Sequence, residues 1–96
     1  MIELIEHGHF KLTGALTFET VPEILRASAT LFAKADHLKV DLADVSQGDS
    51  TGVALLLAWI RQARAHKKSI VFTHIPSQLL MIAKVSNLDD FLVMHG

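Results

Sequence analysis

The residues of this chain whose types and spacing could do chemistry are concentrated in one segment, Gly48-Asp49-Ser50-Thr51-Gly52. Two hydroxyls and one carboxylate stand between two glycines, and an unbroken apolar run, 53–60, follows them. Asp and Ser are favoured where a helix begins, because their side chains accept hydrogen bonds from its first free N–H groups. The segment therefore predicts that Ser50 and Thr51 lie exposed at the positive end of a helix that is otherwise buried.

Two other kinds of chemistry fit the same segment but not the rest of the chain. Residues 48–52 satisfy G-x-S-x-G, the nucleophile elbow of α/β-hydrolases, and Asp89 or Asp90 and then His95 follow in triad order. That elbow requires a sharp turn directly between strand and helix, whereas we predict a loop over 43–47. Phosphate of a nucleotide can bind at a helix start, but neither G-x-x-x-x-G-K-[ST] nor G-x-G-x-x-G is present. We expect no catalytic residue and no cofactor.

Composition and charge limit what the chain can be. Its 96 residues, half of them apolar, predict a single domain, residues 1–96, that folds without disulfides. The absence of cysteine and of an N-terminal signal pattern favours a cytoplasmic location. A formal net charge of −1 without a basic stripe argues against nucleic acid. His7 and His9 flank a glycine, but no third ligand accompanies them, so no metal site is expected.

Hydropathy patterns predict the elements that must position the segment. Alternating and β-branched runs predict strands over 2–6, 9–12, 38–42, 69–73 (central and parallel) and 91–94. Helical periodicity predicts helices over 20–35, 50–66 and 78–86, and Thr20 and Glu23 have capping-box spacing. The order β-β-α-β-α-β-α-β indicates an α/β fold, with a mixed sheet of four to five strands and three to four helices.

The central helix is apolar around most of its circumference. Leu55 and Trp59 lie nearly opposite the face that carries most of its other apolar residues. They could pack on a neighbouring helix of this chain, or they could bind a partner protein, because a small domain has few helices to cover a second face. Trp is enriched among residues that anchor interfaces. We predict a partner-binding surface formed by Asp49, Ser50, Thr51, Leu55 and Trp59.

Three segments resemble the STAS domain family, which includes anti-sigma-factor antagonists and the cytoplasmic tails of sulfate transporters. They are Leu12-Thr13-Gly14-Ala15-Leu16, Val40-Asp41-Leu42 and Asp49-Ser50-Thr51-Gly52-Val53-Ala54-Leu55-Leu56. The resemblance covers essentially the whole chain. It implies the STAS-type fold and a binding subunit that is not an enzyme.

Within the family, the chain is most similar to the MlaB branch, the small stand-alone subunits of bacterial phospholipid ABC transporters that maintain outer-membrane lipid asymmetry. Its short length and the closing segment 83–88 fit that branch. This similarity implies a cytoplasmic protein that docks on the transporter's ATPase subunit and reaches the inner membrane only through that partner. Dimerisation of the free protein stays open.

The antagonist branch implies a different partner, an anti-sigma factor and its kinase, which phosphorylates the hydroxyl after the motif Asp. Ser50 stands where the MlaB branch has Thr. Thr51 stands where antagonists carry the phosphorylated Ser and where the MlaB branch usually has Gly. Phosphorylation of Ser50 or Thr51 is therefore the alternative. Phosphate at a helix N-terminus stabilises the helix by roughly 0.3–1 kcal/mol, so we expect binding, not folding, to respond.

Overall fold

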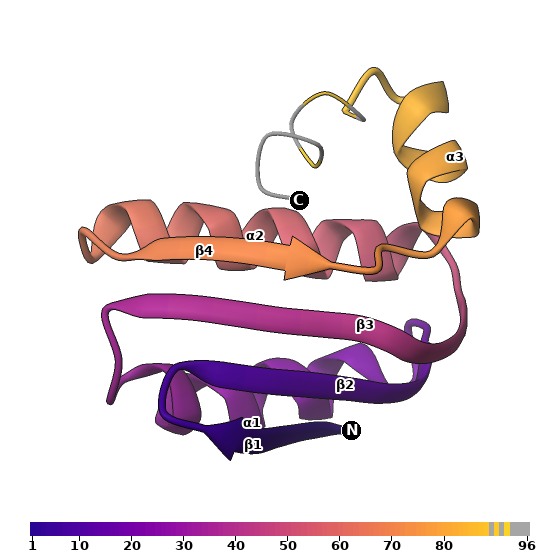
Figure 1. The fold of residues 1–96 in the computed structure, drawn as a ribbon. Helices are drawn as coiled ribbons and strands as arrows, with labels where there is room; N and C mark the ends of the chain where they lie inside the picture. The colour runs from indigo at the N-terminus through magenta and orange to yellow at the C-terminus, as the bar shows by residue number, and fades with distance from the viewer. Residues whose placement is uncertain (89, 91, 93–96) are drawn as a thin grey trace.

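The computed structural model describes residues 1–88, 90 and 92 (Figure 1). Its strands are β1 (Ile2–Glu6), β2 (His9–Leu16), β3 (His37–Gly48) and β4 (Ser69–Thr73). Its helices are α1 (Val21–Phe32), α2 (Ser50–Ala65) and α3 (Ser77–Val85). This order confirms the predicted α/β class.

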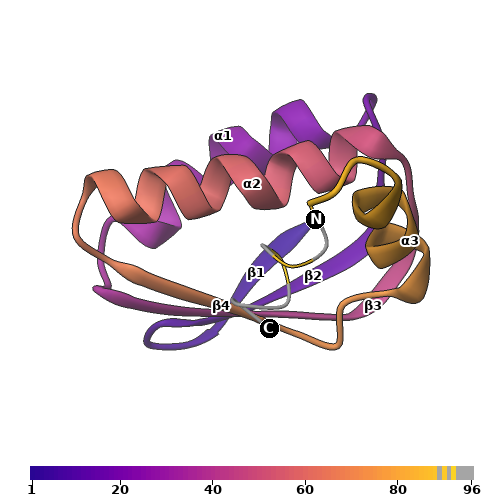
Figure 2. The ribbon, with the colours of Figure 1, turned by 90° about the horizontal axis from the view of Figure 1, so that it is seen from above.

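The strands form one mixed sheet in the order β1-β2-β3-β4. β1 pairs antiparallel with β2, while β2 with β3 and β3 with β4 pair parallel. The two parallel connections cross over through α1 and α2, which lie side by side on one face of the sheet, with α3 at one end (Figure 2). The ends of β2 and β3 therefore lie at the same end of the molecule as the start of α2.

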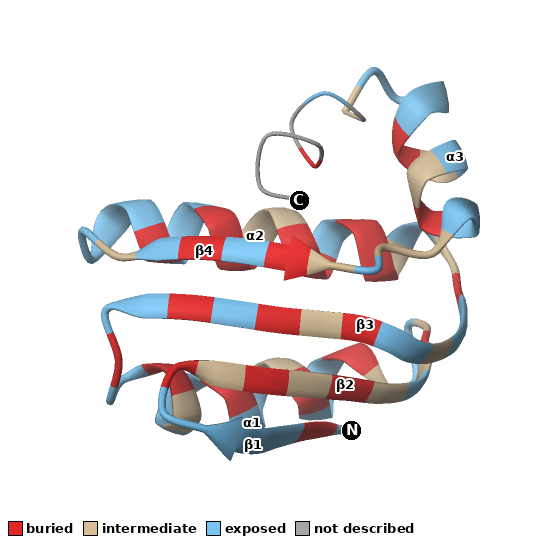
Figure 3. Cartoon of the chain, in the orientation of Figure 1, coloured by how far each residue is buried: buried red, intermediate tan, exposed pale blue. Residues whose placement is uncertain are grey.

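The core lies between the sheet and the two crossover helices. Strand residues alternate between buried and more exposed positions, and the buried set faces α1 and α2 (Figure 3). Four aromatic rings run through this core. Phe32 stands edge-on to Phe10 and Trp59, with ring centroids 4.9 and 5.2 Å away, and Trp59 stacks on Phe72 at 6.4 Å.

The largest departure from the predicted elements is the length of β3. The predicted loop over 43–47 is wrong, because the strand continues to Gly48. Its second half pairs with Thr13–Leu16 of β2 through two register shifts. The irregular pairing removes the alternation by which a strand is predicted from sequence. One consequence is that Asp49 alone separates β3 from α2.

Three further predictions differ from the structure. β4 is parallel as expected, but among the described strands it lies at the sheet edge and not at the centre. Thr20 forms no cap hydrogen bond; its hydroxyl donates to the Ala15 carbonyl at 2.7 Å and ties the β2–α1 loop together. Residues 91, 93 and 94 of the final predicted strand lie outside the described residues, and Leu92 is helical.

Candidate partner-binding site

The start of α2 is held by three elements. Leu16 and Gly48, the last residues of β2 and β3, pair in register. The backbone N–H of Asp49 donates to the Leu16 carbonyl at 3.1 Å. The N–H of Gly48 donates to Oε1 of Gln78, in the first turn of α3, at 3.3 Å. The position of the Asp49-Ser50-Thr51 segment is therefore determined by β2, β3 and α3 together.

Asp49 caps α2, as its sequence position predicts. Its backbone is extended, and its carboxylate accepts a hydrogen bond from the Thr51 N–H at 2.8 Å. Desolvation by itself would raise the pKa of Asp49. Hydrogen bonds from the Thr51 N–H and hydroxyl, and from the N–H groups of Phe18 and Gly52, outweigh it and lower the pKa. These hydrogen bonds keep the Asp49 carboxylate ionised at the N-terminus of α2.

Asp49→Asn should reduce stability in a pH-dependent way. The folded-state pKa of Asp49 lies below its ordinary value of 3.8, so its contribution is complete above that pH and is lost as the pH falls through the lowered pKa. Asn still caps a helix but cannot ionise. We expect the difference in unfolding free energy between wild type and variant to be largest near neutral pH and to shrink below pH 3.8.

Urea titrations from about pH 7 to about pH 2 would measure this difference. Asp41, whose pKa is also lowered, chiefly by a hydrogen bond from the Ala43 N–H, is present in both proteins and cancels. A difference that stays constant across the whole pH range would contradict the assigned role of the Asp49 carboxylate.

The glycines on either side of the segment allow close packing. A Cβ on Gly48 would stand 2.6 Å from Cδ2 of Leu79 in α3. A Cβ on Gly52 would stand 3.0 Å from both the Cβ and the carbonyl oxygen of Leu16. Gly48 therefore lets β3 approach α3 closely, and Gly52 lets α2 approach the end of β2.

Gly48→Ala should cost about 1–3 kcal/mol of unfolding free energy, because the added methyl overpacks against Leu79. Chemical denaturation would measure the loss. The double variant Gly48→Ala/Leu79→Ala provides the control. If the clash is the cause, the stability losses of the single variants Gly48→Ala and Leu79→Ala should sum to more than the loss in the double variant. Strict additivity would point to a cause elsewhere.

Four residues that are at least partly exposed at the N-terminus of α2 form what we call the helix-start surface: Phe18, Asp49, Ser50 and Thr51. Ser50 is exposed, and Asp49 and Thr51 are half-buried. Phe18 lies in the β2–α1 loop, where its N–H contributes to lowering the pKa of Asp49, and the residue is 70% exposed. The sequence analysis missed Phe18. Its only signal was an aromatic residue in a turn, outside the pattern of either flanking element.

Comparison with known proteins identifies the family. A family model described as "Mlab, STAS domain" matches residues 5–94. The chain belongs to the STAS domain family. This STAS domain is 27% identical over 95 residues to an anti-sigma-B factor antagonist of Staphylococcus epidermidis. The match covers 95% of this chain and 88% of that protein.

Solved structures share the fold of this STAS domain. Phosphorylated SpoIIAA, described as a Bacillus cell fate determinant, matches with a TM-score of 0.68 at 19% identity, over 94% of this chain and 85% of that one. Unphosphorylated SpoIIAA, an anti-sigma factor antagonist, matches with 0.62 at 20%, over 79% and 73%. A sulfate transporter family protein from Wolinella succinogenes matches with 0.69 at 11%, over 94% and 75%.

Two residues predicted for the partner-binding surface are not on the surface of the STAS domain. Leu55 and Trp59 are 2% and 1% exposed, and the Trp59 indole N–H donates to Oγ of Ser28 on α1 at 2.9 Å. The alternative that they pack on a neighbouring helix of the same chain holds for Trp59, whereas Leu55 is a buried member of the core. Their prediction as contact residues is wrong, because both side chains are buried in the core, on which α1 and α2 lie side by side (Figure 2).

The start of α2 does not have the geometry of a nucleophile elbow. No loop separates β3 from α2, so the predicted loop over 43–47 does not exclude the elbow. However, the elbow holds its nucleophile in a strained turn. The non-glycine residues with positive φ, among those described, are Lys67, His74 and Asn87, and Ser50 is not one of them. Asp89 and His95 lie outside the described residues.

Neither a metal centre nor a membrane span is found in the described part of the STAS domain. No group of three or more His, Asp or Glu residues among 1–88, 90 and 92 could hold a metal ion. Over the same residues, no helix combines the length and apolar character that a membrane crossing needs.

Proposed function

We propose that this STAS domain is a non-enzymatic, cytoplasmic partner switch of the anti-sigma-factor-antagonist type, which binds its partner through the helix-start surface. The observation that carries the proposal is the pair of hydroxyls, Ser50 and Thr51, at the capped start of α2 beside the exposed Phe18. The relatives named as antagonists favour this role over one in lipid transport.

The two hydroxyls would respond differently to a kinase. Ser50 is the exposed first residue of α2, where phosphate would join the positive helix end without touching the Asp49 cap. The Thr51 backbone N–H donates to the Asp49 carboxylate, so phosphate on the Thr51 hydroxyl would place a second anion close to that carboxylate. Either modification would change the charge of the helix-start surface, so both residues remain candidate phosphorylation sites.

A second candidate function is support of an ABC transporter ATPase in phospholipid transport. The description of the matching family model, "Mlab, STAS domain", favours it. In this case the helix-start surface would contact the ATPase subunit at the inner face of the cytoplasmic membrane. Neither function requires nucleic acid or a cofactor. A homodimer of the free protein would compete with the partner for the helix-start surface.

A pull-down from native cell extract would separate these functions. The tagged wild type would be compared with Thr51→Glu and with Thr30→Glu, an equal charge change at an exposed position of α1. Recovery of an anti-sigma factor and a kinase would support the switch, and recovery of an ABC ATPase would support the transporter role. Loss of the partner only in Thr51→Glu would locate the contact. Equal recovery by all three proteins would rule out the helix-start surface.

A further inference from the structure

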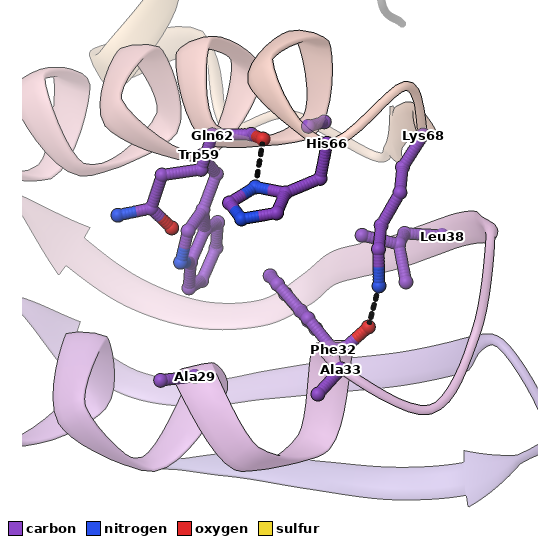
Figure 4. A pocket seen from close by; sticks show the side chains of 9 residues that line it. Ala29, Phe32, Ala33, Leu38, Trp59, Gln62, His66 and Lys68 are labelled. Carbon is purple, nitrogen blue, oxygen red and sulfur yellow. Dashed lines mark hydrogen bonds between the residues drawn. The ribbon is translucent and has the colours of Figure 1, made fainter.

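A hollow of about 560 Å³ opens between the last turns of α1 and α2 (Figure 4). It lies at the opposite end of α2 from the helix-start surface and shares no lining residue with it. Phe32, Leu38 and Trp59 line its apolar part. Ala29 on α1 and Ala33, which directly follows α1, are too small to fill it.

The polar groups of the hollow come from the last turn of α2 and from the segment that follows it. Nζ of Lys68 donates to the Phe32 carbonyl, at the end of α1, at 2.6 Å. An ammonium has three donors, so this bond leaves donor capacity toward the hollow. Gln62 and His66 line the same region, and the His66 ring bonds the Gln62 carbonyl at 2.9 Å (Figure 4). None of the described residues that line the hollow is acidic.

Charge around the hollow favours an anion. Lys34 and Lys67 are exposed at the same end of the molecule, in the segments that follow α1 and α2. Asp36, in the loop between α1 and β3, carries a negative charge that offsets only one of these lysines. An apolar pocket with a few convergent polar groups is the usual form of a small-molecule site. Here the polar groups include a single ammonium, which fits one anionic head group.

We propose that the hollow binds a single-chain anionic amphiphile, a carboxylate or a phosphate monoester with a short apolar tail. The head group meets Lys68, and the tail lies over Phe32 and Leu38 between the two helices. This inference does not rest on the proposed function.

Trp59 provides the readout, because it is the only tryptophan of the chain and it borders the hollow. Its fluorescence would be titrated with decanoate and decyl phosphate below their micellar concentrations. Decanol has the same tail without the charge, and acetate and inorganic phosphate have the heads without the tail. We expect a saturable change with decanoate or decyl phosphate, binding of decanol at least about tenfold weaker, and no change with the heads alone.

Adjacent lysines supply a matched pair of variants. Lys68→Met removes the ammonium at the hollow and should weaken amphiphile binding at least about tenfold. Lys67→Met makes the same charge change outside the hollow and should leave binding within about twofold. Because Lys68→Met also loses the bond to the Phe32 carbonyl, circular dichroism would verify its fold. Ala33→Leu, which fills the hollow and keeps Lys68, should abolish binding independently.

Three results would overturn the proposal. Absence of a saturable change with either anionic amphiphile would mean that the hollow is no ligand site. Equal binding of decanol and decanoate would remove the role of Lys68. Unchanged binding by both Lys68→Met and Ala33→Leu would place the amphiphile elsewhere, for example between two copies of the chain.

Discussion

Replacing Trp59 with alanine is expected to lower the free energy of unfolding by about 3–5 kcal/mol. The indole is 1% exposed, packs edge-on to Phe32 and stacks on Phe72, so its removal leaves a cavity between α1, α2 and the sheet. The change also leaves Oγ of Ser28, which is buried, without its donor. Because a domain of this size is stable by only about 5–15 kcal/mol, the melting temperature should fall by about 12 °C or more.

Far-UV circular dichroism would follow this unfolding, since the variant lacks the fluorescent residue. Phe18→Ala is the matched control, because it truncates an aromatic side chain that is 70% exposed. Its stability should stay within about 0.5 kcal/mol of wild type. Ser28→Ala should fall between the two, at about 1–3 kcal/mol, because it leaves the buried indole N–H unpaired. A Trp59→Ala protein as stable as Phe18→Ala would refute the buried position of Trp59.

A carboxylate introduced at position 51 should weaken partner binding by about 100-fold or more. The Thr51 N–H donates to the Asp49 carboxylate, so Thr51→Glu places a second negative charge close to it. When a partner excludes water from this surface, placing like charges next to one another costs several kcal/mol of binding free energy. Folding should change little, because acidic residues are favourable in the first turn of a helix.

Calorimetry or surface plasmon resonance with the partner recovered from cells would measure this loss. Thr51→Val keeps the shape of the side chain without a charge, so it separates loss of the hydroxyl from gain of the charge. Ser50→Glu tests the neighbouring hydroxyl, and Thr30→Glu repeats the charge change on α1. If Thr51→Val were as defective as Thr51→Glu, the hydroxyl would be a contact group and charge would not be the switch. If neither lost affinity, position 51 would lie outside the interface.

Local patterns predicted most of the elements of this chain. The alternation in 2–6, the apolar periodicity of 21–32 and the apolar run after Thr51 each depend on neighbouring residues along the chain. The same holds for the helix cap at Asp49. These features are local because the groups that satisfy them lie within a few residues.

Hydrogen bonds to neighbouring elements decided the features that the patterns missed. Residues 43–47 look like a loop, but they belong to β3, and Asp44, Val45 and Gln47 pair with Thr13–Ala15 of β2. Thr20 has the sequence position of a helix cap, but its hydroxyl is taken by the Ala15 carbonyl in the preceding strand. In each case a partner distant from the predicted pattern competes for the same polar group.

For the candidate site, the sequence by itself determined the chemistry, and the tertiary structure decided which residues are accessible. The Asp49-Ser50-Thr51 segment predicts a capped helix start with two hydroxyls, because capping needs only the residues of that turn. Helical periodicity places Leu55 and Trp59 on a second face of α2 but cannot say what covers it. Only the packing of α2 into the core shared with the sheet and α1 buries these two residues, and only the β2–α1 loop brings Phe18 to the start of α2. The burial of an apolar face depends on which other element packs against it, and that is a property of the whole fold.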